Sequence, residues 1–225
     1  MIETQKLKKT YKQGSLKVKA VDNVNLKISD GEFTAVVGPS GSGKTTLLNC
    51  IGGLDIPTSG KVIIDNEIIS SYSSDKMIKF RLNNIGFVFQ AYNLIPVLTA
   101  KENIEMVMLM QGYNKQDMDQ RSIGLLNEVG MENMSKRRPA ELSGGQQQRV
   151  AVARALASKP KFILADEPTA NLDSKSTAKL LDIMSRLNKL ENITFVFSTH
   201  DQRVIDRARR VVTLEDGKII KDIKK

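Results

Sequence analysis

Short apolar runs recur at wide intervals along the chain, and each is followed by glycine or polar residues. The runs cover residues 32–37, 85–89, 162–165 and 194–197. Runs of this length, bounded by turn-forming residues, are typical of strands buried on both faces, as in parallel sheets. Because the segments between them carry helical spacing, we predict an α/β fold with a mainly parallel sheet.

Helical spacing is clear in three parts of the chain. Residues 44–51 predict a helix that ends at a glycine pair. A later helix has a core face marked by Leu180, Met184 and Leu187. Residues 99–158 are mostly helical in pattern and contain no strong strand. We therefore expect one domain over residues 1–225, with a helical lobe inserted at about 91–158.

Antiparallel structure is expected near both ends of the chain. Residues 7–11 and 24–28 predict a separate N-terminal antiparallel β patch. Residues 211–221 predict a hairpin that turns at Asp216-Gly217, the best short turn signal in the chain.

A glycine-rich segment, Gly-Pro-Ser-Gly-Ser-Gly-Lys-Thr at residues 38–45, follows a predicted strand and opens a predicted helix. Glycines let the backbone curl so that successive N–H groups face an anion, and the helix N-terminus adds partial positive charge. Lys44 can reach the β- and γ-phosphates, and the Thr45 hydroxyl is placed to ligate Mg²⁺. The alternative, a flexible glycine turn, explains neither the flanking elements nor the Lys-Thr pair. The segment therefore predicts a site for ATP and Mg²⁺.

Polar residues also follow the other predicted strands at their carboxyl ends, where ligands of open α/β sheets collect. Asp166 would orient Mg²⁺, and Glu167 would polarise a water for attack on the γ-phosphate. The amide of Gln90 could touch Mg²⁺ or that water, and His200 is the only histidine of the chain. Each could instead be structural, as a cap, a turn residue or a lone histidine. The convergence of strand ends favours the catalytic interpretation.

A second candidate anion site is Ser143-Gly144-Gly145-Gln146, which precedes another predicted helix. A serine and two glycines at this place make an anion-binding helix cap. Many helices begin in this way, so the motif by itself is a weak signal.

Composition narrows the cellular compartment and the classes of partner that the protein can have. No apolar run approaches the roughly 18 residues needed to cross a bilayer, and the N-terminal residues lack the apolar stretch of a signal peptide. Cys50 is the only cysteine, which excludes an intramolecular disulfide and fits a reducing compartment such as the cytoplasm. The formal charge of +9 is compatible with a solvated lysine-rich surface, an anionic membrane nearby or nucleic acid. Because the basic residues are scattered, no specific nucleic acid is expected.

In their order, these motifs resemble those of ABC-type ATPases along nearly the whole chain. Residues 38–45 resemble the Walker A motif, 143–146 the signature, 162–167 the Walker B motif with its catalytic glutamate, and 171–173 the D-loop. Tyr11 resembles the adenine-stacking aromatic of the family, Gln90 its Q-loop glutamine and His200 its switch histidine.

The resemblance implies a P-loop NTPase core that binds and hydrolyses ATP. The nucleotide-binding residues it implies are Tyr11, Gly38, Ser40, Gly41, Ser42, Gly43, Lys44, Thr45, Thr46, Ser143, Gly145, Gln146 and Asp173. The implied metal ligands are Thr45, Gln90 and Asp166, and the implied catalytic residues are Glu167, His200 and Gln90.

The family also implies partners. Two such domains pack head to tail, so that Ser143 closes over the γ-phosphate held by the opposite Walker A motif. We therefore expect an ATP-dependent homodimer that powers a separate integral membrane permease. The permease would hold the chain at the inner face of the cell membrane and would dock on residues 90–136.

Within the family, residues 53–60, 87–94 and 165–169 resemble the subgroup of lipoprotein-releasing (LolD-like), macrolide-exporting (MacB-like) and cell-division (FtsE-like) ATPases. The chain departs from that subgroup at Ala170, where glycine is common. The alternative is a soluble ABC-type ATPase acting on DNA or ribosomes, but the long coiled coil or second Walker A motif of such relatives is not found here. The intact Glu167 and His200 disfavour a nucleotide sensor without turnover.

Overall fold

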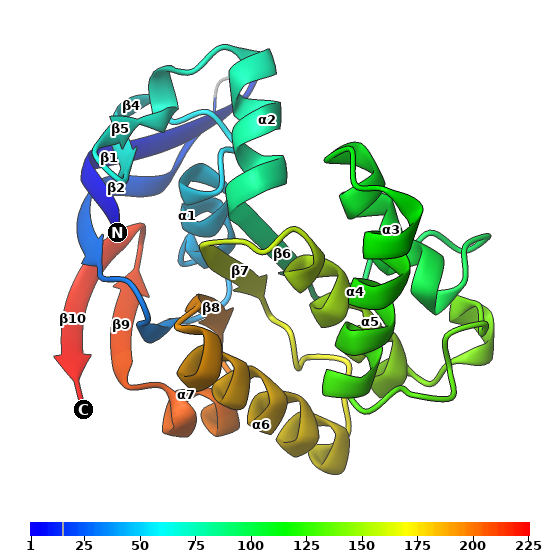
Figure 1. Cartoon of the computed structure of the whole chain (residues 1–225). Coiled ribbons are helices and arrows are strands. Elements are labelled where there is room, and N and C mark those ends of the chain that lie inside the picture. Colours follow the sequence, from blue (N-terminus) through cyan, green and yellow to red (C-terminus); the bar gives the residue numbers. More distant parts are fainter. Residues whose placement is uncertain (15) are drawn as a thin grey trace. The chain divides into compact units, whose positions relative to one another are not determined.

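The computed structural model describes residues 1–14 and 16–225, and the chain divides into two compact units. The first unit comprises Met1–Arg81 and Thr194–Lys225, and the second comprises Leu82–Ile193. Figure 1 labels their helices and strands. The helical lobe expected at about 91–158 stays a prediction.

The first unit contains a four-stranded sheet in the order β2-β1-β4-β5, drawn in blue to cyan in Figure 1. Its strands are β1 (Ile2–Gln13), β2 (Leu16–Ile28), β4 (Ser59–Ile64) and β5 (Glu67–Ile68). β1 pairs antiparallel with β2, which confirms the predicted N-terminal patch, and its other edge pairs antiparallel with β4. Leu7, Val24 and Ile28 lie in the core beneath this sheet.

The first unit also contains a parallel group of strands. β3 (Phe33–Val37) pairs in parallel with both β8 (Thr194–Thr199) and β9 (Arg210–Glu215), and β10 (Lys218–Lys224) pairs antiparallel with β9. The hairpin turns at Asp216 and Gly217, whose φ angles of 47° and 74° suit a tight turn, as predicted. Phe33, Phe195 and Phe197 pack together, with the Phe33 and Phe197 ring centroids 4.6 Å apart.

The helices around these strands are short. α1 (Lys44–Ile51) follows β3 and matches the predicted helix at both ends. The 3₁₀ helix η1 (Ile69–Ser71) and then α2 (Ser74–Asn84) follow β5, and α7 (Gln202–Arg207) follows β8. Cys50 on α1 is buried, and burial raises the pKa of its thiol to about 12.

In the second unit, β6 (Ile85–Phe89) pairs in parallel with β7 (Phe162–Asp166). Its helices are α3 (Ala100–Met110), α4 (Lys115–Glu128), α5 (Gly144–Ala157) and α6 (Ser174–Glu191), with the 3₁₀ helix η2 (Pro139–Glu141) before α5. α5 packs against α3, α4, α6 and β6. The approach to β6 is so close that a Cβ on Gly86 would lie 2.6 Å from the Ala155 carbonyl oxygen. The predicted core face of α6 is confirmed, because Leu180, Met184 and Leu187 are buried.

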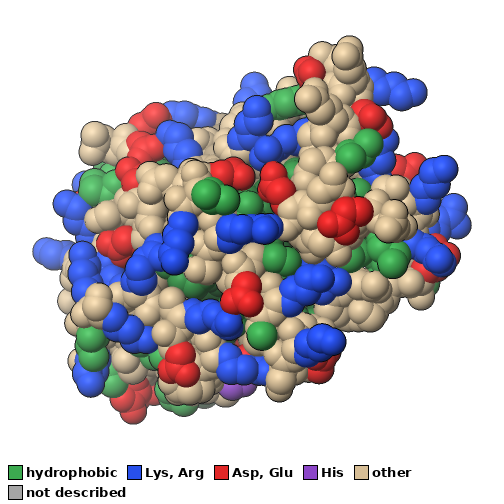
Figure 2. Space-filling model, turned by 60° about the horizontal axis from the view of Figure 1, so that its bottom comes forward, with side chains coloured by type: hydrophobic (Ala, Val, Ile, Leu, Met, Phe, Trp, Pro, Cys, Tyr) green, Lys and Arg blue, Asp and Glu red, His purple; other side chains and the backbone are tan. Residues whose placement is uncertain are grey.

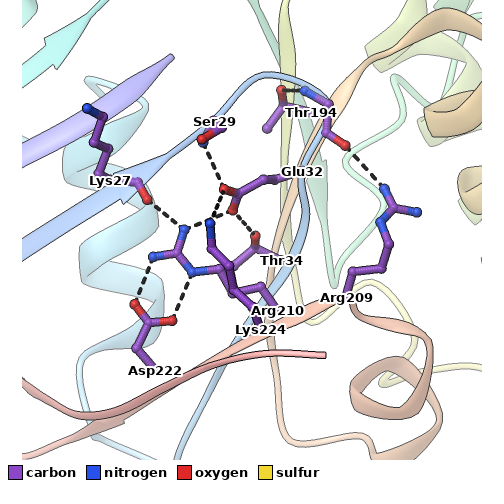
Figure 3. Close-up of polar contacts among 10 residues, drawn as sticks. Lys27, Ser29, Glu32, Thr34, Thr194, Arg209, Arg210, Asp222 and Lys224 are labelled. Atoms are coloured by element: carbon purple, nitrogen blue, oxygen red, sulfur yellow. Dashed lines mark hydrogen bonds and ion pairs between the residues drawn. The ribbon is translucent and has the colours of Figure 1, made fainter.

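A network of ion pairs closes the hairpin of the first unit onto the connection from β2 to β3 (Figure 3). The guanidinium of Arg210 donates to Glu32 Oε2 at 2.9 Å and to both Asp222 oxygens at 2.8 and 2.7 Å. The hydrogen bonds from Arg210 lower the pKa of Asp222. Burial opposes ionisation of Glu32, but the hydrogen bonds from Arg210, the Ser29 N–H and Thr34 lower its pKa below the ordinary value. These ion pairs therefore fasten the last strand to the rest of the unit.

The surface carries charges of both signs. On the face drawn in Figure 2, Lys and Arg side chains are spread widely, with Asp and Glu side chains between them. Among the described residues, no helix is long and apolar enough to span a membrane.

Candidate functional site

The glycine-rich segment forms a closed loop between β3, which ends at Val37, and α1, which begins at Lys44. The loop bends back because Gly38, Gly41 and Gly43 have φ angles of 153°, 78° and 99°, which favour glycine. The Lys44 side chain turns over the loop and donates to the carbonyl oxygens of Gly38 and Pro39 at 2.9 and 3.0 Å. Its ammonium group is therefore held at the mouth of the loop.

The walls of the loop are backbone atoms from elsewhere in the first unit. A Cβ on Gly38 would lie 2.0 Å from the Leu214 carbonyl oxygen, and one on Gly43 would lie 1.9 Å from that of Ala20. The hairpin turn supports the loop as well, since the Gly217 N–H donates to the Ser42 carbonyl oxygen at 3.0 Å. The loop therefore depends on glycine for steric as well as conformational reasons.

The inside of the loop is suited to an anion. The N-cap of the described helix α1 is Gly43, which has no side chain to cap the helix, and the first turn contains no acidic residue. Backbone N–H groups of such a helix start can be satisfied by a ligand. The Ser42 hydroxyl is buried and has no hydrogen-bond partner among the described residues. A phosphate group would supply the acceptors that these donors require.

His200 lies next to the phosphate loop along the sheet. β3 and β8 are paired so that Val37 is opposite Thr199, and Gly38 and His200 are the next residues on each strand. His200 is exposed. The following residue, Asp201, is the N-cap of α7 and accepts from the Arg203 N–H at 2.9 Å, which fixes the end of the segment.

Tyr11, the predicted adenine-stacking residue, lies near the end of β1 and is 42% exposed. Its hydroxyl donates to Asp55 Oδ2 at 2.5 Å. Asp55 follows α1 in the chain, and sequence reasoning gave it no role. The first unit thus contains Tyr11, the phosphate loop with Thr45 and Thr46, and His200.

The predicted residues of the second unit also meet at strand ends. β6 and β7 are paired so that Phe89 is opposite Asp166, and Gln90 and Glu167 are the next residues on each strand. Glu167 has a φ of 46°, a left-handed conformation that is uncommon outside glycine and is found at functional sites. The amide of Asn171 donates to the Gln90 carbonyl oxygen at 3.1 Å, which links the predicted D-loop to the predicted Q-loop.

Ser143 caps α5, as predicted. Its hydroxyl accepts from the Gln146 N–H at 3.3 Å, and the Gln146 side chain accepts from the Ser143 N–H at 2.8 Å, which forms a capping box. Ser143 itself is exposed. The capped helix start therefore faces solvent with its serine outermost.

The signature glycines pack closely on other segments of the second unit. A Cβ on Gly144 would lie 2.6 Å from the Tyr92 hydroxyl, and one on Gly145 would lie 2.7 Å from the Ser176 hydroxyl. Asp173 is the N-cap of α6 and accepts from the Ser176 N–H and hydroxyl at 2.9 and 2.7 Å. The signature motif is thereby joined to the D-loop.

Sequence reasoning missed two supports of this second group. The buried side chain of Gln148 donates to the carbonyl oxygens of Phe89 and Pro168 at 3.3 and 2.7 Å. Arg154 donates to the carbonyl oxygens of Tyr92 and Asn93. Both side chains fix backbone segments by hydrogen bonds. The only sequence signal for them was their place in the helix after the signature.

Comparison with known proteins decides the family. The family model described as "ABC transporter" matches residues 21–170 of the chain. The chain belongs to the ABC transporter family. This ABC protein is 45% identical over 228 residues to the uncharacterized ABC transporter ATP-binding protein MJ0796 of Methanocaldococcus jannaschii, and the match covers 100% of this chain and 97% of that protein. It is 42% identical over 219 residues to the lipoprotein-releasing system ATP-binding protein LolD of Legionella pneumophila, with coverage of 97% and 96%.

Solved structures agree with the assignment. The dimeric structure of a post-hydrolysis state of the ATP-binding cassette MJ0796 bound to ADP and Pi matches with a TM-score of 0.93 and 43% identity, and the match covers 100% of this chain and 98% of that chain. The α/β fold predicted from sequence is therefore confirmed, and the relatives agree with the predicted subgroup of LolD-, MacB- and FtsE-like ATPases. An ABC-type ATPase acting on DNA or ribosomes is not favoured.

Proposed function

We propose that this chain binds ATP with Mg²⁺ on residues 38–46, hydrolyses it, and uses the cycle to drive transport through a separate membrane permease. The observation that carries the proposal is the Lys44 ammonium held by two carbonyl oxygens of a loop that ends in a helix start without a side-chain cap. The buried Ser42 hydroxyl supports it, since a phosphate oxygen would be its acceptor.

The donor set of the chain fits Mg²⁺. This ion binds through one or two protein oxygens together with substrate phosphates, and it neutralises charge on those phosphates. Thr45 would hold it from the second position of α1, with Asp166 at the end of β7 and the Gln90 amide as further ligands.

Hydrolysis would depend on groups at the other strand ends. Glu167 would accept a proton from the attacking water, and its left-handed backbone turns the chain at the end of β7. Gln90, which follows the strand residue beside Asp166, would help to position that water. His200, one strand from the phosphate loop, would interact with the γ-phosphate.

We further propose that the complete site requires two copies of the chain. Ser143, Gly145 and Gln146 of one copy would contact the γ-phosphate bound to the other, and Asp173 would lie near the same interface. Support comes from the exposed Ser143 at a capped helix start and from the dimeric structure of MJ0796. Two nucleotides buried in the interface would favour the closed dimer, because each contacts both copies.

The partner permease is inferred from relatives. LolD is named as the ATP-binding protein of a lipoprotein-releasing system, and a further structural match, cbiO1 of Clostridium perfringens, is described as part of an ABC transporter complex. We propose that this chain likewise attaches to a permease at the cytoplasmic face of a membrane, and that residues 90–136 contribute to the docking surface.

Equilibrium binding of a nonhydrolysable ATP analogue tests the central proposal. Lys44→Ala should weaken binding by about 10-fold or more, because a charge-assisted contact to phosphate is lost. Lys61→Ala is the matched control, since Lys61 is an exposed lysine on β4 of the same unit. Equal affinity of the Lys44 variant and the wild type would contradict the proposed site.

A further inference from the structure

The Tyr11 ring is tethered through its hydroxyl. Asp55 Oδ2 accepts a hydrogen bond of 2.5 Å from the hydroxyl, although the two residues are 44 positions apart in the chain. Burial and this hydrogen bond raise the pKa of Tyr11, so the phenol stays protonated as a donor. The ring therefore cannot swing out of its orientation without breaking a charge-assisted hydrogen bond.

Lys9 completes the arrangement. Lys9 and Tyr11 lie two residues apart on β1, and their side chains are on the same side of the strand, since Lys9 Nζ lies over the Tyr11 ring. Lys9 Nζ donates to Asp55 Oδ1 and to the Ile56 carbonyl oxygen, and it lies 5.0 Å from the centroid of the Tyr11 ring. The Lys9 side chain is only 14% exposed, so its ammonium group acts as a fixed support for both partners.

Asp55 is itself fixed to the phosphate helix. Its N–H donates to the Asn49 carbonyl oxygen at 3.2 Å, near the end of α1, the helix that begins with Lys44. The same loop is joined to β1 on its other side, where the Thr58 N–H donates to the Lys8 carbonyl oxygen at 2.8 Å. One short helix thus sets the spacing between the phosphate loop and the Tyr11 ring.

We propose that Asp55, supported by Lys9, is a positioning residue that presents the Tyr11 ring to the purine base of the nucleotide. The proposal rests on the proposed function, because it assumes that ATP binds beside Tyr11. Tyr11 is 42% exposed, which leaves room for a flat aromatic ligand to stack on its ring. A tethered ring loses little freedom when the base arrives, so the contact contributes more to affinity than a mobile ring would.

A second cluster with the same chemistry provides an internal control. The Tyr72 hydroxyl donates to Glu67, and Lys76 Nζ contacts Glu67 at 3.3 Å and lies 3.7 Å from the Tyr72 ring centroid. This tyrosine, carboxylate and lysine lie outside every proposed nucleotide contact. Variants of these residues therefore show how much nucleotide binding and hydrolysis change when such a cluster is disrupted away from the proposed site.

The experiment compares three readouts in the full chain: equilibrium binding of ADP, equilibrium binding of inorganic tripolyphosphate, and the KM and kcat of ATP hydrolysis. Asp55→Ala and Tyr11→Phe should each weaken ADP binding and raise KM by about 3- to 10-fold, the value of one hydrogen bond. Tripolyphosphate binding and kcat should stay within about 2-fold, because the phosphate site is intact. The double variant should be no weaker than the weaker single variant, since both remove the same bond. Glu67→Ala and Tyr72→Phe should change none of these values.

Several outcomes would overturn the inference. Unchanged ADP affinity in Asp55→Ala, with weakened affinity in Tyr11→Ala, would show that the ring needs no positioning residue. Equal losses for ADP and tripolyphosphate in Asp55→Ala would indicate a general distortion of α1. Thermal unfolding of each variant identifies a folding defect. The isosteric variant Asp55→Asn is a milder change, because Asn keeps the acceptor for Tyr11 and loses only the charge opposite Lys9. If Lys44→Ala and Tyr11→Ala both leave nucleotide affinity unchanged, the proposed function itself is wrong.

Discussion

Val37 on β3 and Thr199 on β8 are paired in parallel register, so Gly38 and His200 leave neighbouring strands at the same level. The first glycine of the phosphate loop and the only histidine of the chain are thus fixed relative to each other by the ladder of the sheet. In the second unit, the pairing of Phe89 with Asp166 does the same for Gln90 and Glu167. Strand register is therefore what brings predicted site residues together within each unit.

His200→Ala should lower kcat of ATP hydrolysis by about 10²- to 10⁴-fold, the range for loss of a catalytic proton-transfer or polar group. ATP affinity should change little, since Lys44 and the loop remain. Phosphate release under saturating ATP measures the effect. Gln202→Ala, two residues later on α7, is the control and should keep normal turnover.

Glu167→Gln should abolish steady-state hydrolysis and keep ATP binding, because the amide cannot accept a proton from water. With hydrolysis blocked, ATP should hold the chain as a dimer, which size-exclusion chromatography with ATP would detect. Glu132→Gln, at an exposed acidic residue, controls for the loss of charge. Normal turnover in the Glu167 variant would remove that residue from its proposed role.

Mixed dimers test whether Ser143 acts on the nucleotide of the opposite copy. A Ser143→Arg variant and a Lys44→Ala variant should each be inactive alone. When they are mixed, one site per mixed dimer combines an intact Lys44 with an intact Ser143, so activity should return to about a quarter of wild type for random pairing of independent sites. No recovery at any ratio would mean that both residues act within one chain.

Gly145→Ala should destabilise the folded chain, because the new methyl group would lie 2.7 Å from Ser176 Oγ and 2.8 Å from its Cβ. The cost should be about 1–3 kcal/mol of folding stability, as in other overpacked sites. Ser176→Gly in the same chain removes both clashing atoms and should restore part of the stability. Urea unfolding of the two single variants and the double variant measures the coupling, and strictly additive losses would speak against this contact.

Arg210→Met should destabilise the chain at neutral pH by about 2–3 kcal/mol, less than a fully buried pair because Asp222 is 38% exposed. The folded pKa values of Glu32 and Asp222 lie below their ordinary values of 4.5 and 3.8. A lowered carboxyl pKa gives stability that is present above the ordinary pKa and lost as the pH falls through the folded one. The difference between wild type and variant should therefore be full at pH 7 and should begin to shrink as the pH falls below about 4. Urea unfolding across this pH range checks this, with the exposed pair of Arg137 and Glu141 as control.

Much of the fold could be predicted from sequence because the decisive signals are local. β6 lies on a mainly apolar run, α1 lies between a glycine loop and a glycine pair, and both match the predicted ranges. β4 was missed because it begins with Ser-Gly-Lys and exists through its pairing with distant β1. α2 was missed because none of its residues is buried, so it carries no apolar stripe.

The same distinction applies to the candidate site. Lys44, Glu167 and Ser143 could be proposed from sequence because each lies at a strand end or a helix start, which sequence marks well, and their roles stay predictions. Asp55 could not, because its importance comes from a tyrosine 44 residues away. Gln148 was also missed, since it binds carbonyl oxygens of two separate segments, and backbone acceptors have no sequence signature.

The glycine-rich loop is shaped from outside itself, by the carbonyl oxygens of Ala20 on β2 and Leu214 on β9 and by the Gly217 N–H. An eight-residue phosphate motif of this kind is therefore not a portable cassette. Transplanted into another scaffold, residues 38–45 would keep their composition and lose the contacts that give the loop its curvature. Any protein engineered to carry this loop would also have to inherit a strand and a hairpin turn from opposite ends of the chain.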